Sequence, residues 1–145
     1  MCKVEKDIVF TNYMTPNEYN SLRESVKLSS LMTEQARRGL ANTTFLICAR
    51  KNEEAIGMGR VLFDFGNTAY IADVLVSPTY QHHGLGTEIV NNLIKMVMDT
   101  AGTGEKIMFI LGATKGKESF YSKFGFETRP NDRLGCGMSM SIIKK

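Results

Sequence analysis

The segment Gln81-His82-His83-Gly84-Leu85-Gly86-Thr87 combines residue types that can hold a phosphate group. It follows an apolar run that ends at Val76-Ser77-Pro78, and the clearest helical pattern of the chain begins inside it. The first turn of a helix presents free backbone N–H groups and a partial positive charge. Glycine removes the side chains that would keep a ligand away from the backbone. The pattern indicates either a phosphate or pyrophosphate cradle or an ordinary strand-to-helix turn.

Two familiar nucleotide-binding motifs do not fit this segment, because it lacks a third glycine at the dinucleotide spacing and the Gly-Lys-Ser/Thr of a Walker loop. His82 and His83 are the only histidines, and no metal-ligand spacing surrounds them. We therefore expect exposed loop residues near the phosphates, and no metal. Cys2, Cys48 and Cys136 lie far apart without a C-x-x-C pair, which favours a reducing, cytoplasmic location.

The elements around this loop are predicted from apolar periodicity and turn signals. We expect strands over 4–10, 44–50, 55–63, 69–76, 107–111 and 136–143, and helices over 16–27, 33–39 and 115–124. Thr15 and Glu18 have capping-box spacing around Pro16, and Thr33 is the expected cap of the second helix. The long helix that starts in the loop has apolar residues every four positions, at Leu85, Ile89, Leu93 and Val97.

This order predicts an α+β fold: a mixed, mostly antiparallel sheet with helices on both faces and a central strand–helix–strand unit. A chain of 145 residues is expected to form one domain over 1–145. The net charge of +3 and the scattered basic residues argue against a nucleic-acid partner. Apolar runs such as 107–111 are too short to span a membrane, and the first seven residues lack the apolar core of a secretory signal.

Three blocks of the sequence resemble the GNAT family of N-acetyltransferases. Residues 81–86 match its Gln/Arg-x-x-Gly-x-Gly/Ala signature, and Asp73-Val74-Leu75-Val76-Ser77-Pro78 is similar to the strand that precedes it. Phe120-Tyr121-Ser122-Lys123-Phe124-Gly125-Phe126 resembles the family's aromatic-Tyr-x-x-x-Gly-Phe motif. The resemblance implies an acyl-coenzyme A N-acyltransferase fold. It also implies acetyl-coenzyme A as cosubstrate, with its pyrophosphate held by the backbone amides of the loop.

The resemblance also implies roles for acid–base residues. An attacking alkylamine has a pKa of about 10.4 in water, so it must lose a proton, and the thiolate leaving group must gain one. The resemblance places Tyr121 near the coenzyme sulfur as general acid; a core aromatic beside Phe120 and Phe124 is the alternative. Asp73 is the candidate base, because strand alternation puts it on one face with Ile71 and Leu75, an apolar setting that favours proton uptake. A structural Asp, with ordered water as base, is the alternative.

Other binding roles have equally clear alternatives. Backbone groups of Leu75 and Val76 are expected to meet the pantetheine arm, unless they pair with a next strand. The hydroxyl of Thr87 can add to the cradle or belong to an ordinary first turn. Gly57 and Gly59 share one strand face and predict a shallow groove. Arg60 beside them is expected to form a structural ion pair, or else to meet an acidic substrate group.

We expect acetyl transfer by direct attack on a small-molecule amine, because neither Cys48 nor Cys136 has a nearby histidine to activate it. A non-catalytic acyl-coenzyme A sensor, a protein acetyltransferase and a nucleotide-phosphate binder are the alternatives. Met138 and Met140 alternate on the last predicted strand, where the resemblance suggests an apolar interface that could join two copies.

Overall fold

The computed structural model describes residues 5–145, so Cys2 and the start of the first predicted strand at Val4 lie outside the described residues. The elements are β1 (Ile8–Thr11), α1 (Pro16–Ser25), α2 (Thr33–Ala41), β2 (Phe45–Lys51), β3 (Glu54–Phe63), β4 (Thr68–Val76), the short 3-10 helix η1 (Pro78–Tyr80), α3 (Leu85–Met98), β5 (Met108–Ile110) and α4 (Glu118–Ser122). The chain divides into two compact units, Met1–Ile110 and Leu111–Lys145. The single domain expected over 1–145 stays a prediction.

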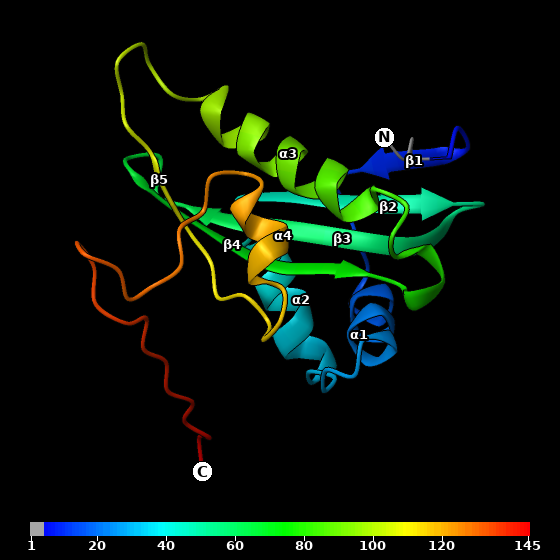
Figure 1. Cartoon of the computed structure of the whole chain (residues 1–145). Helices are drawn as coiled ribbons and strands as arrows, with labels where there is room; N and C mark the ends of the chain where they lie inside the picture. Colours follow the sequence, from blue (N-terminus) through cyan, green and yellow to red (C-terminus); the bar gives the residue numbers. More distant parts are fainter. Residues whose placement is uncertain (1–4) are drawn as a thin grey trace. The chain divides into compact units, whose positions relative to one another are not determined.

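The first unit contains a five-stranded sheet in the order β1-β2-β3-β4-β5. All neighbours are antiparallel except β4 and β5, which are parallel and are joined through α3. Helix α3 covers one face of the sheet, and α1 and α2 lie on the other (Figure 1). The α+β prediction, with its central strand–helix–strand unit, is therefore confirmed.

Helix α1 begins as its sequence predicts. The N–H of Glu18 donates to Thr15 Oγ1 at 3.2 Å, and the N–H of Thr15 donates to Glu18 Oε2 at 2.8 Å, which completes the capping box. The cap predicted for the second helix is wrong by one residue. Thr33 is the first residue of α2, and the cap position belongs to Met32, which offers no side-chain acceptor.

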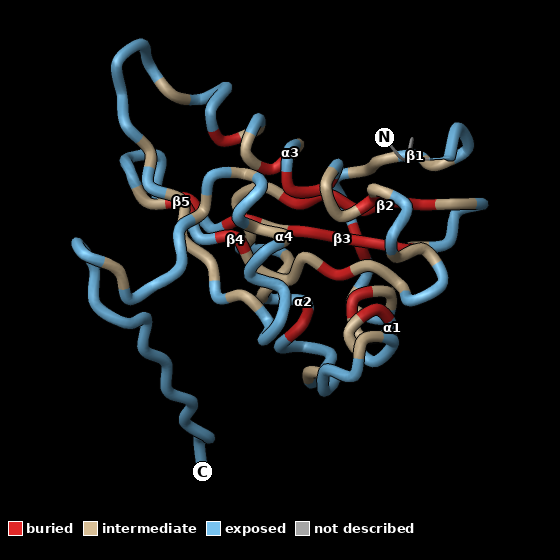
Figure 2. The backbone as a smooth tube through the Cα atoms, viewed as in Figure 1, coloured by how far each residue is buried: buried red, intermediate tan, exposed pale blue. Residues whose placement is uncertain are grey.

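The apolar stripe of α3 is buried against the sheet, since Leu85 is 2% exposed and Ile89, Leu93 and Val97 are fully buried (Figure 2). A methyl group added at Gly59 would lie 2.5 Å from Ile89 Cγ2 and 2.8 Å from Leu93 Cδ1. The helix therefore fills the space above this strand. The prediction of a groove at Gly57 and Gly59 is wrong, because α3 occupies the space that the missing side chains leave.

A buried ion pair joins α1 to β2 on the opposite face. Arg50 is 8% exposed and donates through Nη1 to Glu18 Oε1 at 2.6 Å and through Nη2 to Glu18 Oε2 at 3.1 Å. Its remaining donors reach Thr11 Oγ1 and the carbonyl groups of Tyr13 and Glu53. Because every nitrogen of the guanidinium has an acceptor, the charge is buried with full compensation.

The second unit contains α4, which is shorter than the helix predicted over 115–124. Gly125 ends its last turn with φ +96°, and its N–H donates to Ser122 O at 3.1 Å. The prediction of a strand over 136–143 is wrong, because these residues form no strand in the described part of the chain. Met138 in this segment is 96% exposed. Residues 107–111 form a shorter strand than predicted, and it is only partly buried. No helix within residues 5–145 is both long and apolar enough to cross a membrane.

Candidate functional site

The loop after β4 delivers the chain to α3 through a left-handed glycine. Gly84 has φ +84° and occupies the cap position of α3, where no side chain accepts a hydrogen bond from the helix. The first intrahelical bond runs from the Glu88 N–H to the Gly84 carbonyl at 3.1 Å. Helix geometry therefore leaves the N–H groups of Leu85, Gly86 and Thr87 without helical acceptors. Three amides and the positive end of the helix dipole meet at this point, which suits an anion.

Gln81 has a role that the sequence pattern did not reveal. Its side-chain amide donates to the Val76 carbonyl at 2.9 Å, and its backbone N–H donates to the Pro78 carbonyl at 3.3 Å. The residue thus ties the loop to the end of β4. His82, at φ +66°, and His83 are exposed, as expected for loop residues. Across residues 5–145, no three His, Cys, Asp or Glu side chains gather in a way that could hold a metal ion.

The outer edge of β4 is open over its second half. Strand β5 pairs with β4 only from Thr68 to Tyr70. On the inner side, the Ser77 N–H donates to the Ile56 carbonyl at 2.9 Å, so the next pair, Val76 with Gly57, is of the non-hydrogen-bonded kind. The N–H and carbonyl of Val76 therefore point to the open edge, where the carbonyl meets Gln81 and the N–H stays available to a ligand.

A β-bulge interrupts β4 within this open stretch. Met58 pairs with Leu75 and Arg60 pairs with Ala72, so Asp73 and Val74 together oppose the single residue Gly59. Asp73 has φ +50°, in the left-handed region. The extra residue reverses the alternation of side chains along the strand.

The prediction that Ile71, Asp73 and Leu75 share a face is therefore wrong for Ile71, while Asp73 and Leu75 both face α1. Ile71 pairs with Val61 on the face covered by α3. Leu75 packs in a buried cluster with Met58 on the face covered by α1 and α2.

The Asp73 carboxylate accepts hydrogen bonds from three side chains. Tyr19 Oη donates to Oδ2 at 2.7 Å, Arg60 Nε donates to Oδ2 at 2.6 Å, and Arg23 Nη1 donates to Oδ1 at 3.3 Å. Burial, together with the bond to Asp73, raises the pKa of Tyr19, so its phenol keeps the proton that it donates. Arg60 thus forms the structural ion pair that was expected.

No sequence pattern marks Tyr19 and Arg23 as site residues. They lie one turn apart on α1, but Tyr19 is 54 residues from Asp73 along the chain. Only the packing of α1 against β4 could reveal the contact.

Tyr121 lies on α4 in the second unit, among aromatic rings. Its ring centroid is 4.9 Å from that of Phe120 and 6.1 Å from that of Phe126. Burial raises the pKa of Tyr121 above its ordinary value of about 10, so the phenol stays protonated at neutral pH and is a weaker acid than an exposed tyrosine. Burial also raises the pKa of the Cys48 thiol to about 11, and Cys48 is fully buried. This thiol is therefore unsuited to nucleophilic attack.

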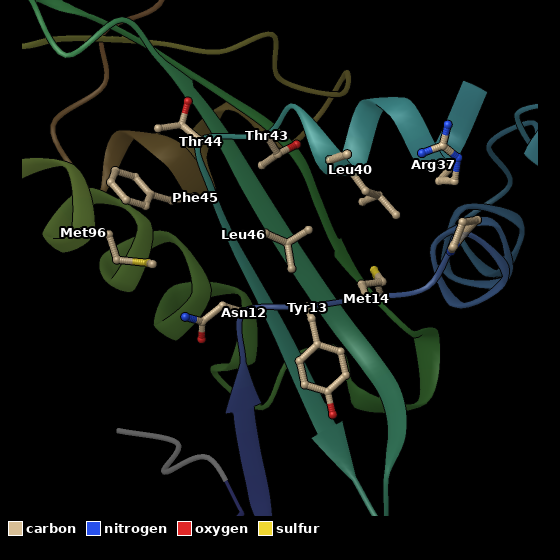
Figure 3. Close-up of a pocket in the computed structure, with 12 residues that line it drawn as sticks. Asn12, Tyr13, Met14, Arg37, Leu40, Thr43, Thr44, Phe45, Leu46 and Met96 are labelled. Atoms are coloured by element: carbon tan, nitrogen blue, oxygen red, sulfur yellow. The ribbon is translucent and has the colours of Figure 1, made fainter. Parts of the chain in front are cut away.

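A cavity of the first unit lies away from the loop before α3. It has a volume of about 390 Å³ and opens where β1 leaves the edge of β2, with Leu46 at its centre and Arg37 and Met96 at its sides (Figure 3). One of its lining residues, Thr43, accepts a hydrogen bond from Arg60, but none belongs to the loop or to the open edge of β4. A second cavity of about 260 Å³ touches the loop at His83 and Leu85.

Comparison with known proteins is consistent with this arrangement. The sequence model of the acetyltransferase (GNAT) family matches residues 10–126. An uncharacterized N-acetyltransferase of Pyropia yezoensis is 29% identical over 140 residues, which are 92% of this chain and 78% of that protein. The chloroplastic GCN5-related N-acetyltransferase 2 of Arabidopsis thaliana is 35% identical over 86 residues, 59% of this chain and 32% of its own length.

Among solved structures, a probable acetyltransferase of unknown function from Staphylococcus aureus superposes with a TM-score of 0.82. It is 28% identical, and the match covers 93% of this chain and 99% of that one.

Proposed function

Since the chain belongs to the acetyltransferase (GNAT) family, we propose that it transfers the acetyl group of acetyl-coenzyme A to the amine of a small molecule. Both substrates would be bound together, and the amine would attack the thioester directly. The nitrogen forms a bond to the acetyl carbon and the carbon–sulfur bond breaks. The amine loses one proton, and the departing thiolate gains one.

The N-terminus of α3 is the observation that carries this proposal. Its left-handed Gly84 and the free amides of Leu85, Gly86 and Thr87 suit a pyrophosphate. The outward N–H of Val76 suits an amide-containing arm that lies along the open edge of β4, whereas the same alternation turns the backbone groups of Leu75 toward β3 and leaves Leu75 only a place beside that arm. We assign Gln81 to holding these two parts together, and His82 and His83 to the rim of the phosphate site.

Tyr121 is the proposed acid, because a phenol carries its proton at neutral pH and can donate it, or a hydrogen bond, to the departing thiolate. Asp73 remains the candidate base, with ordered water as the alternative. Its three hydrogen-bond donors favour the water, because Asp73 could accept a proton only after one donor moves away. The buried Cys48 supports direct attack rather than an acyl-cysteine intermediate.

Location and oligomeric state stay predictions. A cytoplasmic place was expected from the cysteine pattern, while one relative is named as chloroplastic. If two copies of the chain associate through residues 136–143, these residues must be accessible. Met138 and Met140 are exposed in the second unit, as this association requires.

Initial-rate kinetics test the proposal. Product formation is followed by mass spectrometry while acetyl-coenzyme A and a panel of small amines are varied, which avoids interference by the exposed thiol of Cys136 with thiol reagents. Direct attack predicts intersecting double-reciprocal lines. Parallel lines would contradict it, and binding of acetyl-coenzyme A without turnover of any amine would favour the non-catalytic module.

A further inference from the structure

The network around Asp73 holds more positive charge than its one carboxylate neutralises. Within the described residues, Arg23 and Arg60 both form their ion pairs with Asp73. None of the carboxylates on α1 and α2 forms an ion pair with Arg23 or Arg60: Glu18 pairs with Arg50, Glu34 pairs with Arg37, and Glu24 accepts a hydrogen bond from Ser30. The two arginine side chains are only 16% and 19% exposed, so the surplus charge is largely removed from water.

Both guanidinium groups also keep unused donors. Arg60 donates through Nε to Asp73 and through Nη1 to Thr43 Oγ1. Arg23 donates through Nε to the Ser29 carbonyl and through Nη1 to Tyr19 and Asp73. Neither Nη2 group has a protein acceptor among residues 5–145. Since no side-chain nitrogen there is buried without a partner, both Nη2 groups are reached by solvent.

We infer that Arg23 and Arg60 bind an anionic group, a carboxylate or a phosphate, carried by the acceptor amine. A guanidinium matches the paired oxygens of both groups, and a second anion would neutralise the surplus charge. The network is fixed to the bulge at Asp73, which lies in the same open half of β4 as Val76. An acceptor anchored there would lie next to the segment that is proposed to hold the thioester arm. The inference rests on the proposed function, since it names the acceptor class of that reaction.

The first test measures binding without acetyl-coenzyme A. Protein labelled with ¹⁵N-arginine is titrated with phosphoethanolamine against ethanolamine, and with γ-aminobutyrate against its amide, while the Arg Nε–Hε resonances are followed by NMR. We expect both anionic probes, or one of them, to shift the signals of Arg23 and Arg60, with the exposed Arg37 as internal control. No shift, an equal shift with the neutral analogues, or an equal response at Arg37 would overturn the inference.

The second test uses variants and turnover. Arg60→Lys and Arg23→Lys keep the charge but remove the planar fork, and Arg37→Lys is the matched control. We expect the first two to weaken the anionic probe about 10- to 100-fold, as for loss of a charge-assisted hydrogen bond, and the control to leave it unchanged. Circular dichroism and thermal unfolding verify that each variant is folded.

In the acetylation assay, kcat/KM should favour each anionic amine over its neutral partner. Equal values would overturn the inference and leave the proposed function intact. If no amine is acetylated, the proposed function fails, and the NMR titration still decides whether the anion site exists.

Discussion

The ion pair between Glu18 and Arg50 should control the acid stability of the fold. Hydrogen bonding to Arg50 lowers the pKa of Glu18 from 4.5 to about 2. A carboxyl group with a depressed pKa contributes stability above its unfolded-state pKa and loses it as the pH falls through the folded-state value. The contribution is therefore complete at neutral pH, declines below about pH 4.5 and is nearly gone at about pH 2.

Glu18→Gln removes the charge and keeps the shape and the bond to the Thr15 N–H. Each pKa unit corresponds to about 1.36 kcal/mol, and the Glu18 side chain is 28% exposed, so screening reduces the total to about 2–3 kcal/mol. We expect urea unfolding at pH 7 to show this loss, and the difference from the wild type to shrink by more than half at about pH 3.

The control is Glu34→Gln, which removes the exposed ion-pair partner of Arg37 and should leave the free energy of unfolding unchanged within error. A difference between Glu18→Gln and wild type that is constant from pH 7 to pH 3, or absent at pH 7, would refute the electrostatic argument. A constant difference would mean that the lost stability does not come from the charge of Glu18, and no difference would mean that the other acceptors of Arg50 suffice.

Three further predictions concern packing, capping and catalysis. Gly59→Ala should lower the free energy of unfolding by about 1–3 kcal/mol, because the added methyl group clashes with α3. Gly57→Ala, whose nearest contacts would be at 3.2 Å, should lower it by less. Equal decreases of the unfolding free energy in the two variants, measured by thermal unfolding, would contradict this packing. Thr15→Ala should cost about 1 kcal/mol and Thr33→Ala under about 0.5 kcal/mol by urea unfolding, since only Thr15 caps a helix. Tyr121→Phe should lower kcat about 100-fold and leave the dissociation constant of acetyl-coenzyme A within about twofold; unchanged turnover would remove the acid role.

Local patterns predicted the parts of the fold that depend on neighbouring residues. The four-residue spacing from Leu85 to Val97 identified α3 and its buried face. The capping box at Thr15 fixed the start of α1. The glycines of the loop indicated a helix start with free amides. Gly84 allows the chain to enter α3 there, because it adopts a left-handed conformation that most other residues avoid.

The features that were missed depend on contacts between distant segments. The bulge at Asp73 changes side-chain alternation within one strand, and its partners come from α1 and β3. An aspartate tolerates φ of +50° better than most residues do, but that preference alone does not place a bulge. In the segment 136–143, the alternation of apolar and polar residues predicts a strand that does not form. No neighbouring strand pairs with this segment in the described part of the chain, and a strand needs such a partner.

The binding of acetyl-coenzyme A at the N-terminus of α3 is the central claim, and calorimetry of Gly86→Glu tests it most directly. A glutamate in the first turn suits the helix dipole, so the variant should fold, while its charge repels the pyrophosphate. The matched control, Asn91→Glu, adds the same charge on an exposed position of α3. We predict that wild type and Asn91→Glu bind acetyl-coenzyme A in preference to ATP or NAD, and that Gly86→Glu binds it at least about 100-fold more weakly with an unchanged Tm. Binding by Gly86→Glu at wild-type affinity, or equal binding of ATP by the wild type, would contradict the assignment of this site.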